Sequence, residues 1–445
     1  MKTLFAVLSL AVLLPAQQPA SDPFIKGGGK PKAGAPAPQQ PQAEPDVVFL
    51  LETFTLPQSQ YTAWIDTPAD REKLHARVIE AVQKGTAALD GCHFIRTRPG
   101  TRCTLDASEE FIYPTQWSKA DHTTGLQYPE AMEMSPMGDR LEFEPVVDDH
   151  GSLLTLNHSL ERARFLGYRP VKTAARFQGA VTAALAQQKT LAIQRLVLGL
   201  PALAGTMGVG DAITLVFITP RLISTPPPAE PVSKGAGNPS LTARVISLGR
   251  TRAWELLRQH AGRDDALLTQ LRGLIASKDA VLEHISTTTS QAGQRMVQDS
   301  GEQHYYGTEF DAPFSGTPAR PAIDAQTPAQ PAVRPYQASV TAFDCRQLGF
   351  HWESETVLYH PGNGTASTDL SFSFVKFNGT VKDPAWSPHY PTWPLFINQQ
   401  ATTSVRQPLG TTLLVSTLSP PGETGINGRK DDSRVWFLFL ETTLE

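Results

Sequence analysis

Cysteine is scarce in this chain. Its three cysteines among 445 residues, Cys92, Cys103 and Cys345, are too few for a disulfide framework. Cys92 and Cys103 flank the turn-like segment Arg98-Pro99-Gly100-Thr101, and the spacing leaves two alternatives open: a disulfide or two buried free thiols. A tight turn at this place would set Cys103 opposite Arg96 rather than opposite Cys92, which favours free thiols.

Charged residues are also few and nearly balanced. Asp, Glu, Lys and Arg make up 18% of the chain, the formal net charge is -4, and the calculated pI is near 6.3. This balance gives no electrostatic reason for nucleic acid to bind, so we expect no nucleic-acid partner. With 445 residues, 40% of them hydrophobic, the chain has room for two domains of roughly 150 to 200 residues.

Sequence motifs for catalysis and for metal or cofactor binding are missing. The chain contains no His-Glu-x-x-His, no cysteine pair at zinc spacing and no Gly-x-Ser-x-Gly. The segment GTMGVGD at 205–211 precedes a strand-like stretch, whereas a dinucleotide loop must precede a helix. The adjacent acids Glu109 and Glu110 would point to opposite faces of a strand. We therefore expect no enzymatic activity, no cofactor, no metal and no catalytic residue.

The first residues have the three-part layout of a secretory signal peptide. Lys2 is followed by the apolar run LFAVLSLAVLL and by the small and polar residues PAQQPAS. The apolar run has 11 residues, whereas a membrane-spanning helix needs about 20. Residues 1–20 therefore predict export, and residues 21–46, rich in Pro, Gly, Ala and Gln, are typical of a spacer.

One short pattern occurs twice. The segments EEFIYPTQW at 109–117 and EQHYYGTEF at 302–310 share a Tyr, a Thr and a final aromatic residue at a separation of 193 residues. Further along the chain, MEMSPMGDRLEFE matches FDCRQLGFHWESE at a separation of 211, and ITLVFITPRLI matches VWFLFLETTLE at 222. Blocks that match in the same order indicate two copies of one module.

The two predicted copies span residues 47–223 and 241–445, with a Pro-rich linker at 224–240 and a Pro-rich insert at 311–339. Alternating stretches such as RLEFEPVV and SLLTLNHSL predict strands. Thr67 and Pro68 are typical of a helix start, which predicts a helix near 68–89 and a counterpart near 264–283. We expect a strand-dominated α+β class, each copy having an N-terminal strand and helices packed on a mixed sheet.

These blocks resemble the C-terminal module of the secretins, the outer-membrane ring proteins of type II and type III secretion and type IV pilus systems. The second copy is the closer match, through ISTTTSQAGQRMVQDSGEQHYYGTEF, FDCRQLGFHWESETVL and PLFINQQATTSVRQPLGTTLLVSTL. In the first copy, LVFITPRLI is similar to the family's Thr-Pro-Arg ending. The residues that carry the repeat and the resemblance are Gly100, Arg102, Tyr113, Thr115, Gly138, Glu142, Thr219, Pro220, Arg221, Gly293, Arg295, Tyr306, Thr308, Gly349 and Glu353.

The resemblance implies a non-enzymatic cell-envelope protein with a structural or assembly role in secretion across the outer membrane. Its expected location is the periplasm or the outer membrane, and its expected partners are further copies of the chain or other envelope and secretion components. Because most predicted strands are short, we expect any membrane contact to be indirect. The alternative is a periplasmic carbohydrate-binding protein or hydrolase with β-rich domains.

Overall fold

The structure is a computed structural model that describes residues 45–65, 73–118, 127, 129–148, 150–170, 181–224, 238–260, 262–311, 339–359, 364–381, 393–419 and 434–444. All of these lie in one compact unit, residues 40–445. The predicted signal peptide, most of the spacer and nearly all of the Pro-rich insert and linker lie outside the described residues. Within the described ranges, 73% of residues are in strands and 14% in helices.

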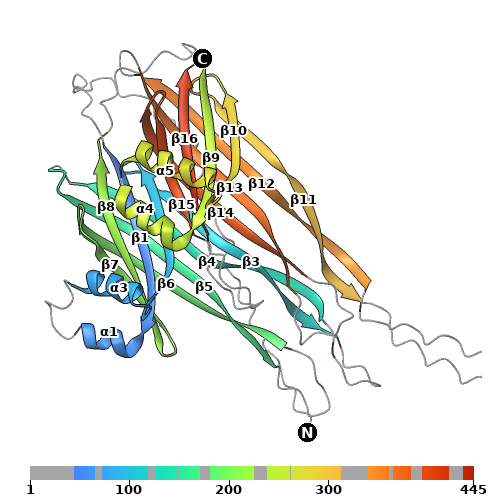
Figure 1. The fold of residues 1–445 in the computed structure, drawn as a ribbon. Coiled ribbons are helices and arrows are strands. Elements are labelled where there is room, and N and C mark those ends of the chain that lie inside the picture. Colours follow the sequence, from blue (N-terminus) through green and yellow to red (C-terminus); the bar gives the residue numbers. More distant parts are fainter. Residues whose placement is uncertain are drawn as a thin grey trace, which may run out of the picture. The chain divides into compact units, whose positions relative to one another are not determined.

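The strands form two sheets of eight strands each (Figure 1). Sheet A contains, in spatial order, β10 (Ala280–Thr289), β9 (Pro239–Gly249), β16 (Arg434–Leu444), β15 (Thr412–Leu418), β2 (Ala88–Thr97), β1 (Asp46–Pro57), β8 (Ala212–Ile223) and β7 (Ala202–Val209). Sheet B contains β11 (Arg295–Asp311), β12 (Ser339–Tyr359), β13 (Thr365–Val381), β14 (Trp393–Pro408), β3 (Cys103–Trp117), β4 (Pro129–Val147), β5 (Leu153–Pro170) and β6 (Val181–Val197).

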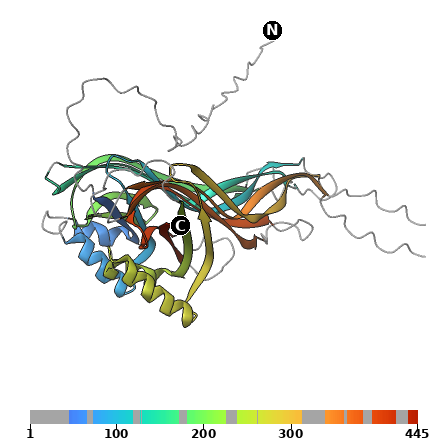
Figure 2. The ribbon, with the colours of Figure 1, turned by 90° about the horizontal axis from the view of Figure 1, so that it is seen from above.

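Sheet A is the middle one of three layers. On one face it carries the helices α1 (Gln58–Trp64), α3 (Leu74–Gln83), α4 (Arg250–His260) and α5 (Asp264–Ala276), and on the other it packs against sheet B (Figure 2). Alternate residues of β1 serve the two faces: Val48 and Leu50 belong to the core under the helices, whereas Val47, Phe49 and Leu51 belong to the core between the sheets. A strand buried on both faces reads as a continuous apolar run, as VVFLL does.

The predicted α+β class with a mixed sheet is wrong, because the fold is mostly β and every strand pairing among the described residues is antiparallel. The physical reason is the connectivity: most consecutive strands are neighbours in a sheet, and short connections between neighbours produce antiparallel pairs. Helices occur between β1 and β2 and between β9 and β10, and they cover one face of one sheet.

Two predictions of element length also need correction. The helix predicted near 264–283 ends at Ala276, and Ala280 already begins β10; the predicted helix start at Thr67 and Pro68 lies outside the described residues. The strands are longer than the sequence pattern indicates, with 21 residues in β12 and 19 in β4. Charged residues inside these strands alternate with buried ones, as in RLEFEPVV, so they occupy the outer face without ending the strand.

The two halves of the chain have the same order of strands. In sheet A the order β2-β1-β8-β7 of the first half is matched by β10-β9-β16-β15, and in sheet B the order β3-β4-β5-β6 is matched by β11-β12-β13-β14. The irregularities match as well. The ladder between β1 and β2 skips Asp90, and the ladder between β9 and β10 skips Glu283, 193 residues later. Likewise, β7 skips Ala204 and β15 skips Val415.

Cys92 and Cys103 are both buried and free, and they lie in different sheets. The turn predicted at Arg98 exists, since the Thr101 amide donates to the Arg98 carbonyl at 3.1 Å. However, the chain passes there from sheet A to sheet B, so β2 and β3 do not pair with each other. Cys103 lies opposite Phe143 rather than opposite Arg96, which corrects the predicted hairpin.

Gly138 and Gly349 occupy matching places where neighbouring strands of sheet B approach closely. Both have positive φ angles, 146° and 106°. A Cβ atom on Gly138 would lie 2.2 Å from the carbonyl oxygen of Ala107, and one on Gly349 would lie 2.2 Å from that of Ser300. Backbone oxygens cannot move aside as a flexible side chain can, so glycine is required at both places.

We predict that Gly138→Ala destabilises the protein by about 3 kcal/mol or more, because the methyl group would force β3 and β4 apart. Gly85→Ala is the matched control: Gly85 has φ of 73° but open space around it, so the change adds backbone strain alone, about 1 kcal/mol. Urea unfolding measures both variants. Equal losses of stability would contradict this account of the close approach.

Candidate functional site

The first and second halves are joined edge to edge in both sheets. In sheet B, β14 pairs with β3 from Phe396 opposite Glu110 to Thr402 opposite Thr104. In sheet A, β15 pairs with β2 at Ser416 opposite Ile95 and Thr417 opposite Phe94. We call this pairing the junction. It makes each eight-stranded sheet out of two four-stranded halves.

Charged side chains reinforce the junction in sheet B. Arg346 of β12 donates from Nε to Glu110 Oε2 at 2.6 Å and from Nη2 to Glu110 Oε1 at 2.5 Å. Asn378 of β13 donates to Glu109 Oε1 at 3.0 Å. Burial raises the pKa of Glu110, and the opposing effect of Arg346 is smaller. The adjacent acids Glu109 and Glu110 therefore hold the second half.

A buried arginine joins the halves at sheet A. Arg96 of β2 donates from Nη2 to Asp264 Oδ2 on α5 at 2.6 Å, and its Nη1 lies 4.0 Å from Asp46 Oδ2. The Arg96 carbonyl also accepts a hydrogen bond from Thr403 of β14. Burial raises the pKa of Asp46 to about 6, with Arg96 opposing it. Removing one member of such a buried set leaves an uncompensated charge, which is strongly destabilising.

The outermost strands of the two sheets match the strands that form the junction. On one side of the molecule the edges are β6 and β7, which match β14 and β15; on the other they are β11 and β10, which match β3 and β2. Inside the chain, β14 pairs with β3 and β15 pairs with β2. The strands that match them, β6 with β11 and β7 with β10, do not pair with each other and lie on opposite sides of the molecule. We call these four strands the free edges, although β11 meets β4 near its end, where Glu309 lies opposite Ala131.

The free edges expose apolar side chains. On β6, Leu191 is 68% exposed and Ile193 74%, and on β11 Val297 is 52% exposed. In contrast, β14, which has a neighbour on each side, is buried along most of its length. Uncovered sheet edges with apolar side chains are typical of surfaces that pair with another chain. The further large apolar residues exposed on these strands are Val197, Val281, Leu282, Ile285 and Tyr305.

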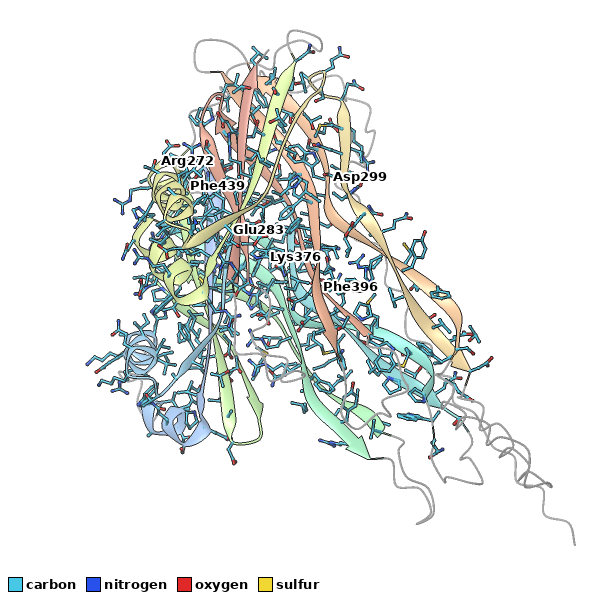
Figure 3. All side chains as sticks on the ribbon, turned by 45° about the vertical axis from the view of Figure 1, so that its right-hand side comes forward. Arg272, Glu283, Asp299, Lys376, Phe396 and Phe439 are labelled. Atoms are coloured by element: carbon cyan, nitrogen blue, oxygen red, sulfur yellow. The ribbon has the colours of Figure 1, made fainter. Side chains whose placement is uncertain are left out.

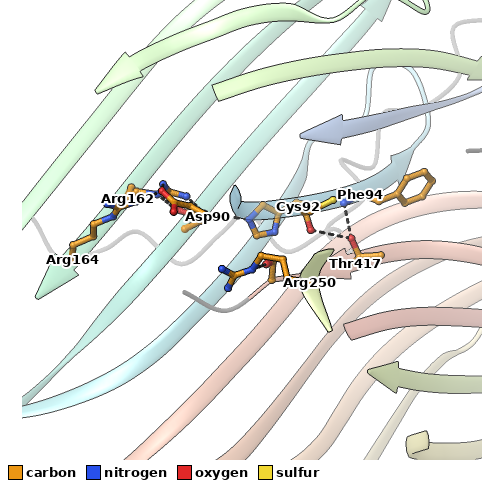
Figure 4. A network of polar contacts seen from close by, with 10 residues as sticks. Asp90, Cys92, Phe94, Arg162, Arg164, Arg250 and Thr417 are labelled. Carbon is orange, nitrogen blue, oxygen red and sulfur yellow. Dashed lines mark hydrogen bonds and ion pairs between the residues drawn. The ribbon is translucent and has the colours of Figure 1, made fainter. Parts of the chain in front are cut away.

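A network of charged groups links the sheets in the first half (Figure 4). Arg162 of β5 donates from Nη2 to Asp139 Oδ2 on β4 at 2.5 Å, and His93 Nε2 of β2 lies 3.2 Å from the same oxygen. Burial alone would raise the pKa of Asp139, but the Arg162 charge and the hydrogen bonds from His93 and Arg162 outweigh it, so the pKa is lowered. Beside them, Arg164 donates to Asp90 at 2.6 Å.

The second half repeats one of these contacts and replaces the other. Glu283, at the bulge that matches Asp90, pairs with Lys376 at 2.9 Å (Figure 3). The positions that match Asp139 and Arg162 are Phe350 and Phe374, which lie opposite each other in β12 and β13. The imidazole of His284 stacks on Phe350 at 4.4 Å between ring centroids. The same space between the sheets is thus ionic in one half and aromatic in the other.

We predict that Asp139→Asn destabilises the protein by about 3 to 5 kcal/mol at pH 7, because it leaves the Arg162 charge buried without a counter-ion. Asp139→Asn combined with Arg162→Met removes both charges, so the double variant should recover more than half of that loss. Chemical denaturation of wild type, both single variants and the double variant measures the coupling. Additive losses would contradict it.

The pH dependence gives a second readout of the same contact. Because the pKa of Asp139 is lowered on folding, the stability it contributes is fully present above its unfolded value, about 3.9, and is lost as the pH falls below that. The difference in unfolding free energy between wild type and Asp139→Asn should therefore shrink from pH 7 to strongly acidic pH. A difference that stays constant would contradict the assignment.

The residues of the sequence repeat lie in matching places in each half. Gly100 and Gly293 both have φ of 70° in turns. Arg102 pairs with Glu142 at 2.5 Å, and the matching Arg295 pairs with Glu353. These cross-strand ion pairs are exposed or half-buried, so they contribute little stability. They join the start of β3 to β4 and the start of β11 to β12.

The remaining repeat residues do not gather into one site. The hydroxyl of Tyr113 lies 3.2 Å from Ser135 Oγ, and that of Tyr306 donates to Asp344 at 3.3 Å. Thr115 and Thr308 are the residues that the ladders of β3 and β11 skip. On β8, Thr219 and Pro220 are buried and Arg221 lies at the edge of a groove.

The charged residues of the junction and of the network were missed by the sequence reasoning. Arg96, Asp139, Arg162 and Arg346 belong to no motif and stand at irregular intervals, and their partners lie far away in the chain. One signal in the sequence points to the network. The repeat sets the charged Asp139 at the position of the apolar Phe350, and an acid at a position that is apolar in the other copy suggests a buried ion pair. In the part of the chain that the structure describes, no group of three His, Cys, Asp or Glu side chains could hold a metal.

No protein-family model matches the chain, and no curated protein matches it. A solved structure of the Klebsiella pneumoniae type II secretion system outer membrane complex, with PulD, PulS and the PulC HR domain, is similar at 13% identity and a TM-score of 0.20, covering 41% of this chain and 41% of that chain. None of the described helices is long and apolar enough to span a membrane.

Proposed function

We propose that this protein is a non-enzymatic structural subunit of the cell envelope, related to secretins, whose copies assemble side by side through their free edges as part of a secretion apparatus. The single observation that carries the assembly is the junction: the chain already contains one edge-to-edge contact between two matching halves. The secretion role rests on the sequence blocks that resemble the secretin module. The periplasm or the outer membrane is the corresponding location.

The proposal includes a duplication of one eight-stranded module. The equal strand order, the matching bulges at Asp90 and Glu283, and the matching glycines Gly138 and Gly349 support it. The hydrogen bonds at the turns support it too: the Gly100 amide donates to the Pro145 carbonyl at 2.7 Å, as the amide of Gly293 does to Thr356. Two modules in one chain then form the first two members of a larger array.

The junction predicts the register of the contact between chains. Thr402 lies opposite Thr104 in the junction, and the matching positions are Leu191 on β6 and Val297 on β11. Two residues earlier on β6, Lys189 would lie opposite Asp299. In this register Leu191 and Val297, both exposed in the single chain, lie opposite each other. The cation of Lys189 lies opposite the anion of Asp299.

Such a contact is heterologous, because the surfaces that meet are different: the β6 and β7 side of one chain meets the β11 and β10 side of the next. Each added chain presents a new free edge, so the contact produces a closed ring when the rotation per chain divides a full turn and an open array otherwise. Backbone groups of β6 and β11 that have no strand partner in the single chain would be hydrogen-bonded in the assembly.

We predict that cysteines at Leu191 and Val297 cross-link neighbouring chains. In a Cys345→Ser background, which removes the exposed thiol, the double variant L191C/V297C should form a ladder of disulfide-linked multimers under mild oxidation. The positive control is T104C/T402C, which tests the same register inside one chain and should form a disulfide within the monomer. Non-reducing electrophoresis distinguishes the two products.

A control out of register sharpens the experiment. L191C/Y305C places the second thiol on the same exposed edge but far from the predicted partner, so it should give few cross-links. Multimers from this pair in equal yield, or none from L191C/V297C while T104C/T402C closes, would contradict the proposed contact.

The alternative, a carbohydrate-binding protein or hydrolase, finds no support at the paired acids. A glycosidase needs two carboxyl groups that face a common substrate. Glu109 and Glu110 instead accept hydrogen bonds from Asn378 and Arg346 and are nearly buried in the junction. Trp393, whose indole would have to be accessible to stack on a sugar ring, is buried at the start of β14.

A further inference from the structure

A groove of about 900 Å³ lies over the helix-covered face of sheet A, between α3 of the first half and α4 of the second. Its floor is formed by β1 and β8, and the turn between β6 and β7 closes one side. We call it the α3–α4 groove. Because both halves supply its walls, the groove exists only where two modules meet. Its volume suits a small molecule or a few residues of peptide.

The two acids that line the groove are already engaged. Glu52 on β1 is almost fully buried; His75 Nε2 of α3 lies 2.7 Å from its Oε2, and Trp254 Nε1 of α4 donates to its Oε1 at 2.5 Å. Glu255 accepts a hydrogen bond from Arg252 at 2.9 Å. A buried carboxylate with hydrogen bonds on both oxygens is a fixed part of the floor.

The two arginines of the groove keep donors to spare. Arg258 stacks over the indole of Trp254, with Cζ 5.0 Å from the ring centroid, and its Nε lies 3.9 Å from Glu52 Oε1. The side chain of Arg221 on β8 has no ion-pair or hydrogen-bond partner among the residues that the structure describes. A guanidinium has five donors in a planar fork, which suits a carboxylate.

The second half shows that the fold does not require this lining. The position that matches Glu52 is Arg244, and the position that matches Arg221 is Thr443. Arg244 pairs there with Glu441 at 2.8 Å, so the charges at these strand positions are satisfied within sheet A. In the second half the arginine at this position forms an ion pair with a neighbouring strand. In the α3–α4 groove, Arg221 and Arg258 keep guanidinium N–H groups that donate to no carboxylate among the described residues.

We propose that the α3–α4 groove binds a short peptide segment that carries one carboxylate. The charges favour a single anion: Arg258 lies beside Glu52 and Glu255 pairs with Arg252, so Arg221 is the one arginine of the groove whose charge no carboxylate of the described residues compensates. The groove also offers amide and hydroxyl groups from Gln83, Thr251 and Gln259, which suit a peptide backbone, beside the apolar surface of Leu50 and Val82. The site is independent of assembly, because one chain forms it.

Three rhodamine-labelled tetrapeptides test the proposal by fluorescence anisotropy. Ala-Leu-Leu-Glu amide carries a side-chain carboxylate, Ala-Leu-Leu-Gln with a free C-terminus carries a terminal one, and Ala-Leu-Leu-Gln amide carries none. We expect one or both of the carboxylate peptides to bind at least about tenfold more tightly than the neutral peptide. Comparing the two shows which kind of carboxylate the groove takes.

Variants of the full chain complete the test. Arg221→Gln and Arg258→Gln should each weaken binding of the carboxylate peptide by about tenfold, whereas Arg272→Gln, an exposed arginine on α5, should leave it unchanged. Circular dichroism verifies that each variant is folded. Equal affinity for the three peptides, no binding of any, or unchanged binding by the R221Q/R258Q variant would overturn the proposal. Competition by inorganic phosphate as strong as that by the carboxylate peptide would also overturn it.

Discussion

The rest of the structure depends on the backbone pairing of β14 with β3 and of β15 with β2. A four-stranded half has open edges, and unpaired backbone groups along an edge strand attract another strand. Inside the chain the second half covers one edge of the first in both sheets, and buried charges at Arg96 and Glu110 hold it there. The same pairing leaves the opposite edges, β6 with β7 and β11 with β10, uncovered. The proposed assembly repeats the contact of the junction between one chain and the next.

The contact between the sheets shows how two similar halves reach the same fold by different chemistry. The first half places Asp139, Arg162 and His93 between the sheets, and the second places Phe350 and Phe374 at the matching positions. The contact in the first half depends on Asp139 staying charged, and the contact in the second half on His284, whose pKa is lowered by burial, staying neutral beside Phe350. Acid therefore weakens both contacts, by removing a charge in one half and by adding a charge in the other.

Local pattern predicted individual strands and the turns at Gly100 and Gly293, because these depend on residues close together in the chain. Fold class was wrong because helical periodicity at 68–89 and 264–283 carried more weight than the many alternating stretches, and because nothing local distinguishes an antiparallel from a mixed sheet. Cys92 and Cys103 were placed on one hairpin, although the chain changes sheets between them. Partners such as Arg346 and Glu110 are 236 residues apart, so no spacing in the sequence could reveal the junction.

Hydrogen–deuterium exchange of the edge strands tests the central claim most directly. In the single chain, alternate backbone amides of β6 and of β11 before Glu309 have no strand partner, whereas the stretches Phe396–Thr402 of β14 and Thr104–Glu110 of β3 have a paired strand on each side. As the protein concentration rises and copies associate, the account predicts that β6 and β11 gain protection together until they approach the level of β14 and β3. Association that leaves the exchange of β6 unchanged would contradict the claim that copies meet through their free edges.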